Sequence, residues 1–430
     1  MKKDQFKAFW LNNKKRNLKI LIAALAVILV VTGIYQGVKI SKWLNQVDQD
    51  AGINFDNADE TYVEDETDFE AIHEADNVVS LEDMLYKWST NGGEKMTGKD
   101  VVNVLLIGVD STDGLASGGN TDAMMIVSLN KETKKITIVS IMRDSFVYMD
   151  INGKKRFFKI NAAYNWGGPA TLMKVVEDSY KIEINNYVCV DFATFPKIID
   201  ALDGVKVEVK PYEASCVRGF FSISIPSGDS VVLDGRSALA FSRVRNCDAD
   251  GDVSRTRRQR AVIMAMIAGV RDASNAQFNS TLDVIFPNIR TNYGKSEMLS
   301  LGTQALVQKW ADFEIVQLTS PSETARASAT IDGRFVWVVD FPVEASAVQM
   351  AMYGSTNIVL EPDRVSALKL LKPKASTASG TGTTAVSATT APTQESTTGE
   401  GLSEDEPTTV KETTTANVSA TTGQVETAAE

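Results

Sequence analysis

An almost continuous apolar run from Val101 to Val109, with the sequence VVNVLLIGV, restricts the folds open to this chain. Such a run is typical of a strand buried on both faces of a sheet. A sheet of this kind needs helices on each side to cover it. Further strands are predicted near 123–129, 135–142, 187–191, 205–209, 313–318 and 335–339, and helices near 161–180, 192–202, 234–243, 254–271, 296–309 and 344–353. This alternation predicts an α/β fold, a three-layer α-β-α sandwich with a central mixed sheet.

The N-terminal segment combines basic residues with a long apolar run. Residues 1–19 carry seven Lys and Arg side chains, and residues 20–38 are almost entirely apolar. As a helix, about nineteen residues span roughly 28 Å, close to the hydrocarbon thickness of a bilayer. The small residues of the run lie inside it, which disfavours a cleaved signal peptide. We expect a cytoplasmic N-terminus over 1–19, one transmembrane helix over 20–38, and the remaining chain outside the cell.

Two polar segments flank the predicted globular domain, residues 100–372. The first, residues 39–99, contains an acid-rich stretch from Asp48 to Asp83 without Lys or Arg. We interpret it as an extracytoplasmic spacer, with a short docking helix near 81–88; calcium binding is the alternative, but EF-hand spacing is missing. The second, residues 373–430, is rich in Thr and Ser, acidic, and lacks aromatic residues. It is predicted to be a disordered tail, because it contains too little apolar surface to bury.

The composition excludes several classes of chemistry. The chain has a single histidine, His73, so neither a Ser-His-Asp triad nor a zinc ion held by histidines is expected. Three cysteines are too few for a disulfide-built fold; Cys189 is predicted to be buried and inert. Cys216 and Cys247 are both placed in loops, and the sequence leaves open whether they form a disulfide. The net charge of -11 argues against a nucleic-acid partner.

Two aspartates flank the loop that follows the first predicted strand. Asp110 ends that strand, and Asp122 follows a loop rich in Gly and Ser. Ligands of open α/β sheets bind at the carboxyl ends of the strands. Carboxylate oxygens are suitable ligands for Mg²⁺, which also binds substrate phosphates. The pair therefore predicts a site for Mg²⁺, or for Mn²⁺; the alternative is that both residues only cap turns or helices.

A series of arginines supplies the second set of candidate site residues. They are Arg143, Arg243, Arg245, Arg255 and Arg258; Arg257 and Arg260 belong to the same run of arginines. Between 243 and 260 every basic residue is Arg, whose planar guanidinium binds phosphate bidentately. In a helical projection Arg255 and Gln259 face the apolar side, whereas Arg257 points away. Inward polar groups need a partner, which a bound anion or a structural salt bridge would supply.

Weaker candidates lie close to these residues in the sequence. Lys159 and Asn161 are placed to reach the same site, although Asn161 is equally suited to cap the helix that begins there. Asp248, Asp250 and Asp252 resemble a metal-binding loop but lack the closing Glu of an EF-hand. We interpret these three aspartates as an acidic loop that balances the arginines.

Taken together and in order, eight segments resemble the LytR-CpsA-Psr family of Gram-positive envelope proteins. These segments are Asn103–Asp110, Thr121–Ser128, Ser140–Asp144, Lys159–Tyr164, Tyr187–Phe192, Leu233–Leu239, Arg243–Arg245 and Asp252–Arg260. The resemblance covers residues 100–355. One departure is that Thr112 and Asn120 stand where many relatives carry arginine. This difference weakens the expected affinity for the pyrophosphate headgroup of the lipid substrate that the family implies.

The resemblance implies a phosphotransferase that moves a glycopolymer from an undecaprenyl-pyrophosphate carrier to peptidoglycan. It implies that Asp110 and Asp122 associate with Mg²⁺, and that a hydrophobic groove takes the prenyl chain. The pyrophosphate-binding residues it implies are Arg143, Arg243, Arg245, Arg255, Arg258 and Gln259, to which we add Lys159 and Asn161. We take Asp110, Arg143, Arg243, Arg245 and Arg255 as the catalytic set. The general base is left open, and Asp110 is a candidate where metal does not fully occupy it.

Two other functions suit the same residues. A polyprenyl-pyrophosphate phosphatase would use this site with water in place of the sugar hydroxyl. A non-catalytic binder or scaffold for lipid-linked wall precursors would use the arginines to bind the pyrophosphate and would catalyse no reaction. The sequence does not choose the polymer, for which teichoic acid and capsule are the candidates.

Overall fold

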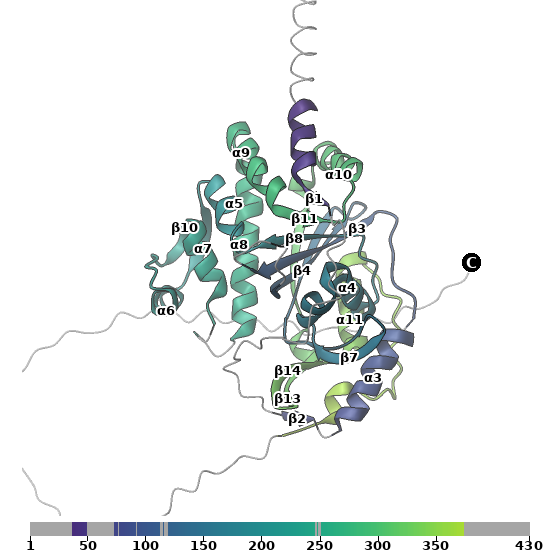
Figure 1. Cartoon of the computed structure of the whole chain (residues 1–430). Helices are drawn as coiled ribbons and strands as arrows, with labels where there is room; N and C mark the ends of the chain where they lie inside the picture. Colours follow the sequence, from purple (N-terminus) through teal and green to yellow (C-terminus); the bar gives the residue numbers. More distant parts are fainter. Residues whose placement is uncertain are drawn as a thin grey trace, which may run out of the picture. The chain divides into compact units, whose positions relative to one another are not determined.

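We describe the protein from a computed structural model (Figure 1). The structure describes residues 37–49, 73–75, 77–91, 93–111, 115, 119–245, 247 and 251–373. The predicted cytoplasmic N-terminus, nearly all of the predicted transmembrane run and the Thr- and Ser-rich tail lie outside these residues. Among the residues described, no helix is both long enough and apolar enough to cross a membrane.

A mixed sheet forms the centre of the domain. Its described strands follow the order β1-β11-β8-β3-β4-β5-β12. They are β1 (Asp48–Gln49), β3 (Val101–Asp110), β4 (Asn120–Asn130), β5 (Lys135–Ile141), β8 (Asn186–Asp191), β11 (Ile289–Thr291) and β12 (Glu314–Ser320). β3 runs antiparallel to β4 and parallel to β8, and β5 runs parallel to β12. The predicted α/β fold with a central mixed sheet is confirmed.

One face of β3 lies in the main hydrophobic core. Leu105, Ile107 and Val109 are at most 1% exposed. They pack with side chains of α4 (Ala162–Tyr180) and α11 (Phe341–Tyr353), which lie together on one side of the sheet in Figure 1. α4 contains the predicted break, because Gly168 has a φ of 74° and Pro169 follows it. The buried face of β3 thus follows from its apolar alternation.

A β-hairpin that was not predicted also packs on this core. It joins β6 (Phe146–Ile151) to β7 (Lys154–Lys159) through Asn152 and Gly153. Both turn residues have positive φ, 53° and 79°, as a type I′ turn requires. An Asn-Gly pair between two strand-like runs is a recognised hairpin signal, so the sequence contained this information.

A second, smaller core lies around a two-stranded ribbon. β9 (Val205–Val209) pairs antiparallel with β10 (Gly228–Leu233). The helices of this part are α5 (Phe195–Ala201), α6 (Pro211–Phe221), α7 (Gly235–Arg243), α8 (Asp252–Asp272) and α9 (Asn275–Ile285). Val207, Val217, Phe241 and Val262 are buried in this core. Figure 1 shows α5, α7 and α8 grouped on the side of the sheet opposite to α4 and α11.

Two predicted strands lie outside the central sheet. The strand predicted near 205–209 is β9 of the ribbon. The strand predicted near 335–339 is β14 (Arg334–Val339), in a sheet ordered β14-β13-β2-β15. The other strands of that sheet are β13 (Arg326–Ile331), β2 (His73–Ala75) and β15 (Leu371–Pro373). Strand propensity predicted the strands, but it contains no information on their pairing partners.

The placement of Cys216 in a loop was wrong, because this residue lies in α6. Pro211 occupies the first turn of α6, where its fixed φ suits a helix start. The backbone N–H of Lys210 donates to Glu213 Oε2 at 3.0 Å and satisfies a group at the helix start. A Pro followed by Glu within one turn is the signal that predicts this helix.

The chain just after the predicted transmembrane run packs on the domain. Residues 37–46 are helical and lie beside α10 (Lys295–Val307) in Figure 1. Trp43 is 6% exposed and its ring stacks on Phe286. Its indole N–H donates to Asp283 Oδ1 at 2.6 Å. An aromatic anchor therefore fixes this segment to the end of α9.

The acid-rich stretch also begins in contact with the domain. Asp48 accepts a hydrogen bond from the buried Arg290 at 2.9 Å, and β1 pairs with β11. Residues 50–72 of the predicted spacer lie outside the described residues. The predicted helix near 81–88 is confirmed as α3 (Val78–Asn91), which packs on the main core.

Candidate active site

A bulge in β4 brings Asp122 to the site. Gly108 faces Ala123 across the strand pair, whereas Val109 faces Thr121, so Asp122 is an extra residue in β4. Such a bulge re-aims a side chain that regular alternation would place elsewhere. Gly108 and Ala123 are small residues where the two strands approach closely. A Cβ on Gly108 would lie 3.0 Å from the Cβ of Ala123.

Three arginines converge on the carboxylate of Asp122, which is 6% exposed. Arg143, two residues after the end of β5, donates from Nη1 to Oδ1 at 2.7 Å. Arg245, in the segment after α7, donates from Nη2 to Oδ2 at 3.2 Å. Arg255, in the first turns of α8, places Nη1 3.9 Å from Oδ1. Arg143 and the two arginines about a hundred residues later in the chain therefore meet at one buried charge.

The arginines determine the protonation of Asp122. Burial by itself raises the pKa of this carboxyl, because the charged form loses hydration. The charges of Arg143, Arg255 and Arg245, together with the hydrogen bond from Arg143, outweigh that effect and lower the pKa to about 2. Asp122 is thus a carboxylate throughout the physiological pH range.

This shift predicts a loss of stability in acid. The pKa of Asp122 is 3.8 ordinarily and about 2 in the folded protein, so the unfolded chain binds more protons between these values. The free energy of unfolding should therefore rise with pH across this interval, by roughly 2 kcal/mol in total. Denaturant unfolding from about pH 2 to about pH 6 measures it. Asp122→Asn should remove this component, and identical pH dependence in both proteins would contradict the assignment.

Asp110 and Arg243 form the more exposed part of the cluster. Arg243 Nη2 lies 3.4 Å from Asp110 Oδ2, and their side chains are 38% and 32% exposed. The Arg243 guanidinium also stacks over the ring of Phe192, at 4.8 Å from its centroid. Asn120, which stands where the family resemblance led us to expect arginine, pairs directly with Asp110 across β3 and β4.

Lys159 extends the cluster on the other side of Arg143. Its Nζ lies 3.1 Å from Asp144 Oδ1, and Arg143 Nε lies 3.5 Å from Asp144 Oδ2. Lys159 is 1% exposed. Asn161 is at the N-cap position of α4, but its side chain makes no capping hydrogen bond. Its backbone N–H donates to the carbonyl of Arg143 at 3.3 Å.

The first turns of α8 follow the helical projection. Arg255 is 2% exposed, and Gln259 Nε2 donates to the backbone carbonyl of Asp122 at 3.4 Å. The side chain of Arg257 is 43% exposed, as predicted for an outward position. Arg258 is fully buried, but its Nη1 donates to Glu213 of α6 at 3.3 Å. The role of Arg258 in binding a headgroup stays a prediction, and this bond gives it a structural partner.

The two aspartates differ in how well they suit a Mg²⁺ ion. Both oxygens of Asp122 already accept from arginines, so this carboxylate fits a metal only if those arginines move. Asp110 fits better, because it is partly exposed and its ion pair with Arg243 is long. Among the residues described, no three His, Cys, Asp or Glu side chains are grouped to hold a metal. One carboxylate with substrate phosphates is nevertheless a common Mg²⁺ environment.

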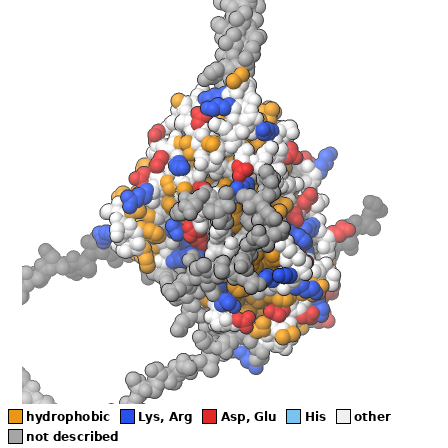
Figure 2. Space-filling model, in the orientation of Figure 1, with side chains coloured by type: hydrophobic (Ala, Val, Ile, Leu, Met, Phe, Trp, Pro, Cys, Tyr) orange, Lys and Arg blue, Asp and Glu red, His pale blue; other side chains and the backbone are white. Residues whose placement is uncertain are grey.

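The face of β3 that carries Asp110 is apolar but only partly buried. Val104, Leu106 and Gly108 alternate with the fully buried residues and are of intermediate exposure. Val188 of β8 lies beside Leu106 and is also of intermediate exposure. This face therefore leads along an apolar strip to the charged cluster at the end of β3. On the surface shown in Figure 2, basic and acidic side chains are interspersed rather than separated.

The loops around the cluster are tied down at several points. Arg290 Nη1 donates to the carbonyl of Leu115, inside the loop between Asp110 and Asn120. Cys216 and Cys247 form a disulfide, which settles the question that the sequence left open.

The weak acidic-loop candidates Asp248 and Asp250 lie outside the described residues, as does Thr112. Asp252 begins α8.

Comparison with known families agrees with the ordered motifs. The profile of the LytR_cpsA_psr family matches residues 54–350. The chain belongs to the LytR-CpsA-Psr family. The match includes every candidate site residue named above.

Two relatives of this LytR-CpsA-Psr protein carry the name polyisoprenyl-teichoic acid–peptidoglycan teichoic acid transferase TagU. The one from Oceanobacillus iheyensis is 34% identical over 212 residues, which are 48% of this chain and 63% of the relative. The one from Bacillus anthracis is 33% identical over 214 residues, 50% of this chain and 67% of the relative. The match thus spans less than two thirds of the Oceanobacillus protein.

A solved structure shares the fold of this LytR-CpsA-Psr protein. The crystal structure of a Streptococcus agalactiae protein has a TM-score of 0.53 and 23% sequence identity. It covers 60% of this chain and 91% of the other. At this level of identity, the likeness concerns the fold alone.

Proposed function

We propose that this LytR-CpsA-Psr protein is a membrane-anchored phosphotransferase that moves a glycopolymer from undecaprenyl pyrophosphate to peptidoglycan outside the cell. The observation that carries the proposal is the convergence of Arg143, Arg245 and Arg255 at the end of an apolar strip. A lipid-linked diphosphate has the matching parts, an anionic headgroup beside an apolar chain. The names of the two relatives support this substrate class and favour teichoic acid as the polymer.

The proposed reaction is an in-line displacement at phosphorus. The acceptor hydroxyl oxygen attacks the phosphorus that bears the sugar, and the new P–O bond forms a phosphodiester. The bridging P–O bond breaks, and polyprenyl phosphate leaves with the electron pair. The proton of the hydroxyl passes to a base, for which Asp110 is our candidate when no metal holds it.

The arginines would act by binding charge that develops on the phosphates. Arg143 and Arg255 have side chains at most 4% exposed, so water screens their charge little. Arg243 and Arg245 lie at the more exposed rim, where they would hold the outer phosphate. Because guanidinium groups are fixed by their ion pairs before substrate binds, little reorganisation is needed at the moment of reaction.

A divalent cation fits the proposal at one position. Asp110 would hold Mg²⁺ together with phosphate oxygens, while Asp122 keeps the arginines in place. When bound, the cation would supply Lewis-acid stabilisation of the phosphate charge. Lys159 and Asn161 would support Arg143 from the opposite side.

The remaining parts of the proposal concern location. A helix over 20–38 would anchor the protein, the three-layer domain would lie outside, and the tail after 373 would be disordered. The Cys216–Cys247 disulfide supports an extracytoplasmic domain, because disulfides persist in oxidising compartments.

Transfer in vitro tests the proposal. The full chain in detergent should attach a lipid-linked teichoic acid precursor to peptidoglycan in the presence of Mg²⁺, and release polyprenyl phosphate. Release of polyprenyl phosphate without attachment would indicate the phosphatase. Binding of the lipid with neither product would leave the binder or scaffold.

A further inference from the structure

We propose that α6 positions the site arginines, through Glu213 and the Cys216–Cys247 disulfide. Glu213 and Cys216 lie on α6, and in the part of the chain that the structure describes Cys247 contacts the cluster only through the backbone carbonyl of Arg245, at 3.6 Å. These three residues hold the short segment that carries Arg245, so they are positioning residues. The inference rests on the proposed function, because it assigns α6 a part in binding the same diphosphate.

The first attachment point is a buried relay from Glu213 to the backbone of Val244. Glu213 and Arg258 are both 0% exposed. Arg258 Nη1 donates to Glu213 Oε1 at 3.3 Å, while Nη2 of the same guanidinium donates to the carbonyl of Val244 at 2.7 Å. Val244 lies between Arg243 and Arg245. The carboxylate of Glu213 thus orients a guanidinium that holds the backbone between two site arginines.

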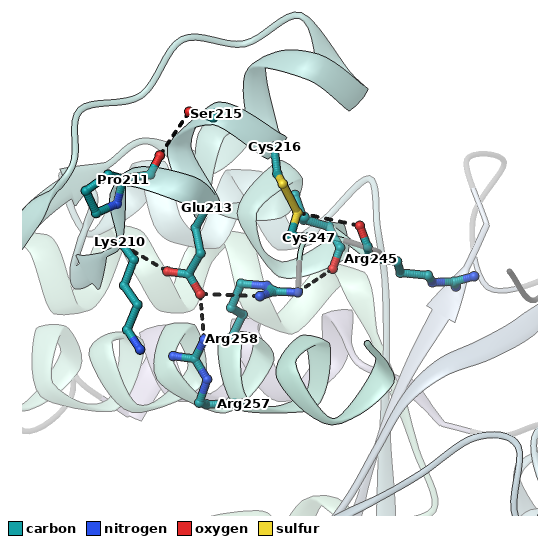
Figure 3. The surroundings of a disulfide bond; sticks show 10 residues. Lys210, Pro211, Glu213, Ser215, Cys216, Arg245, Cys247, Arg257 and Arg258 are labelled. Atoms are coloured by element: carbon teal, nitrogen blue, oxygen red, sulfur yellow. Dashed lines mark hydrogen bonds and ion pairs between the residues drawn. A yellow bond between two sulfur atoms is a disulfide. The ribbon is translucent and has the colours of Figure 1, made fainter. Parts of the chain in front are cut away.

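The second attachment point is the disulfide. Cys216 lies three residues after Glu213 on α6, so both side chains leave the same face of the helix. Cys216 is bonded to Cys247, two residues beyond Arg245, with the two Cα atoms 6.0 Å apart. Figure 3 shows the relay and the disulfide side by side, with the side chain of Arg245 extending away from both.

Together the two points limit the freedom of Arg245. The carbonyl of Val244 is held on one side of it and the sulfur of Cys247 on the other. In the proposal these two ties restrain Arg245, whose Nη2 lies 3.2 Å from Asp122 Oδ2. Holding a binding group in place before the ligand arrives reduces the entropy lost on binding.

Arg257 offers a matched control for the charge of Glu213. Its Nη2 donates to the same oxygen, Glu213 Oε1, at 2.6 Å. Its side chain is 43% exposed, and the bond runs to α6 rather than to the segment that carries Arg245. Loss of Arg257 should therefore remove a partner of Glu213 and leave the relay through Arg258 in place.

Binding of inorganic pyrophosphate to the full chain, measured by calorimetry, tests the inference. Glu213→Leu should raise the Kd by between about tenfold and about a hundredfold, because the arginines lose their fixed position. Glu213→Gln keeps an acceptor for Arg258 and should restore much of the affinity, whereas Arg257→Ala should bind like the wild type. Equal Kd values for folded Glu213→Leu and wild type would overturn the inference.

The disulfide allows an independent test on the wild-type protein, so that no variant has to fold. Reduction of the folded wild type should raise the Kd for pyrophosphate, and reoxidation should restore it. An unchanged Kd after complete reduction would overturn the part assigned to Cys216 and Cys247. Failure of the wild type to bind pyrophosphate at all would instead reject the proposed function, and this inference with it.

Discussion

Replacing Arg255 by alanine is expected to reduce transfer of a lipid-linked polymer to peptidoglycan by at least about a hundredfold. Arg255 is 2% exposed and lies 3.9 Å from Asp122, on the inward side of α8. A buried guanidinium that binds transition-state charge contributes about 3 kcal/mol or more. The measurement is kcat/KM for transfer, together with thermal denaturation to confirm that the variant folds.

A second arginine of the same helix provides the control. Arg271 is in the last turn of α8, and it forms an ion pair with its exposed neighbour Asp272. Arg271→Ala should change transfer by less than about twofold, because exposed ion pairs contribute little. Full activity of a folded Arg255→Ala protein would remove the arginine cluster from the mechanism.

Asp122→Asn is expected to have the largest effect on stability. This substitution keeps the shape of the side chain but leaves Arg143, Arg245 and Arg255 around a neutral group. Loss of this charge costs at least the roughly 2 kcal/mol of the pH-dependent component, and up to about 5 kcal/mol, since the remaining charges are poorly compensated. Chemical denaturation should show a decrease of this size in the free energy of unfolding at neutral pH.

The same variant should respond more strongly to anions than the wild type does. Pyrophosphate would replace the missing negative charge among the three arginines, and binding to the folded state stabilises it. The increase in Tm caused by pyrophosphate should therefore be larger for Asp122→Asn. Asp272→Asn, at an exposed ion pair, is the control and should match the wild type. A smaller increase for Asp122→Asn would contradict an anion site at this cluster.

The fold could be predicted from local patterns where burial alone decides it. The apolar run that became β3, and the Gly-Gly-Pro break in α4, were recognised from residue type and spacing. The pairing of β9 with β10 was not recognised, because strand propensity does not identify the partner of a strand. The start of α6 was missed although its Pro and Glu indicate it, so Cys216 was placed in a loop.

The site followed from the sequence only in part. Helical spacing identified Arg255 and Gln259 as inward residues, and both reach Asp122. The same spacing does not reveal that Arg258, fully buried, faces a different acid, because Glu213 comes from a helix 45 residues earlier. The position of Asp122 depends on a bulge, which adds one residue to a strand and has no pattern in the sequence alone.

The most direct test is a crystal structure of the protein with a polyprenyl pyrophosphate and Mg²⁺. The account predicts that the diphosphate lies against Arg143, Arg245 and Arg255, with the cation at Asp110 and the prenyl chain along the face of β3 that carries Leu106. A diphosphate bound away from these three arginines would contradict it.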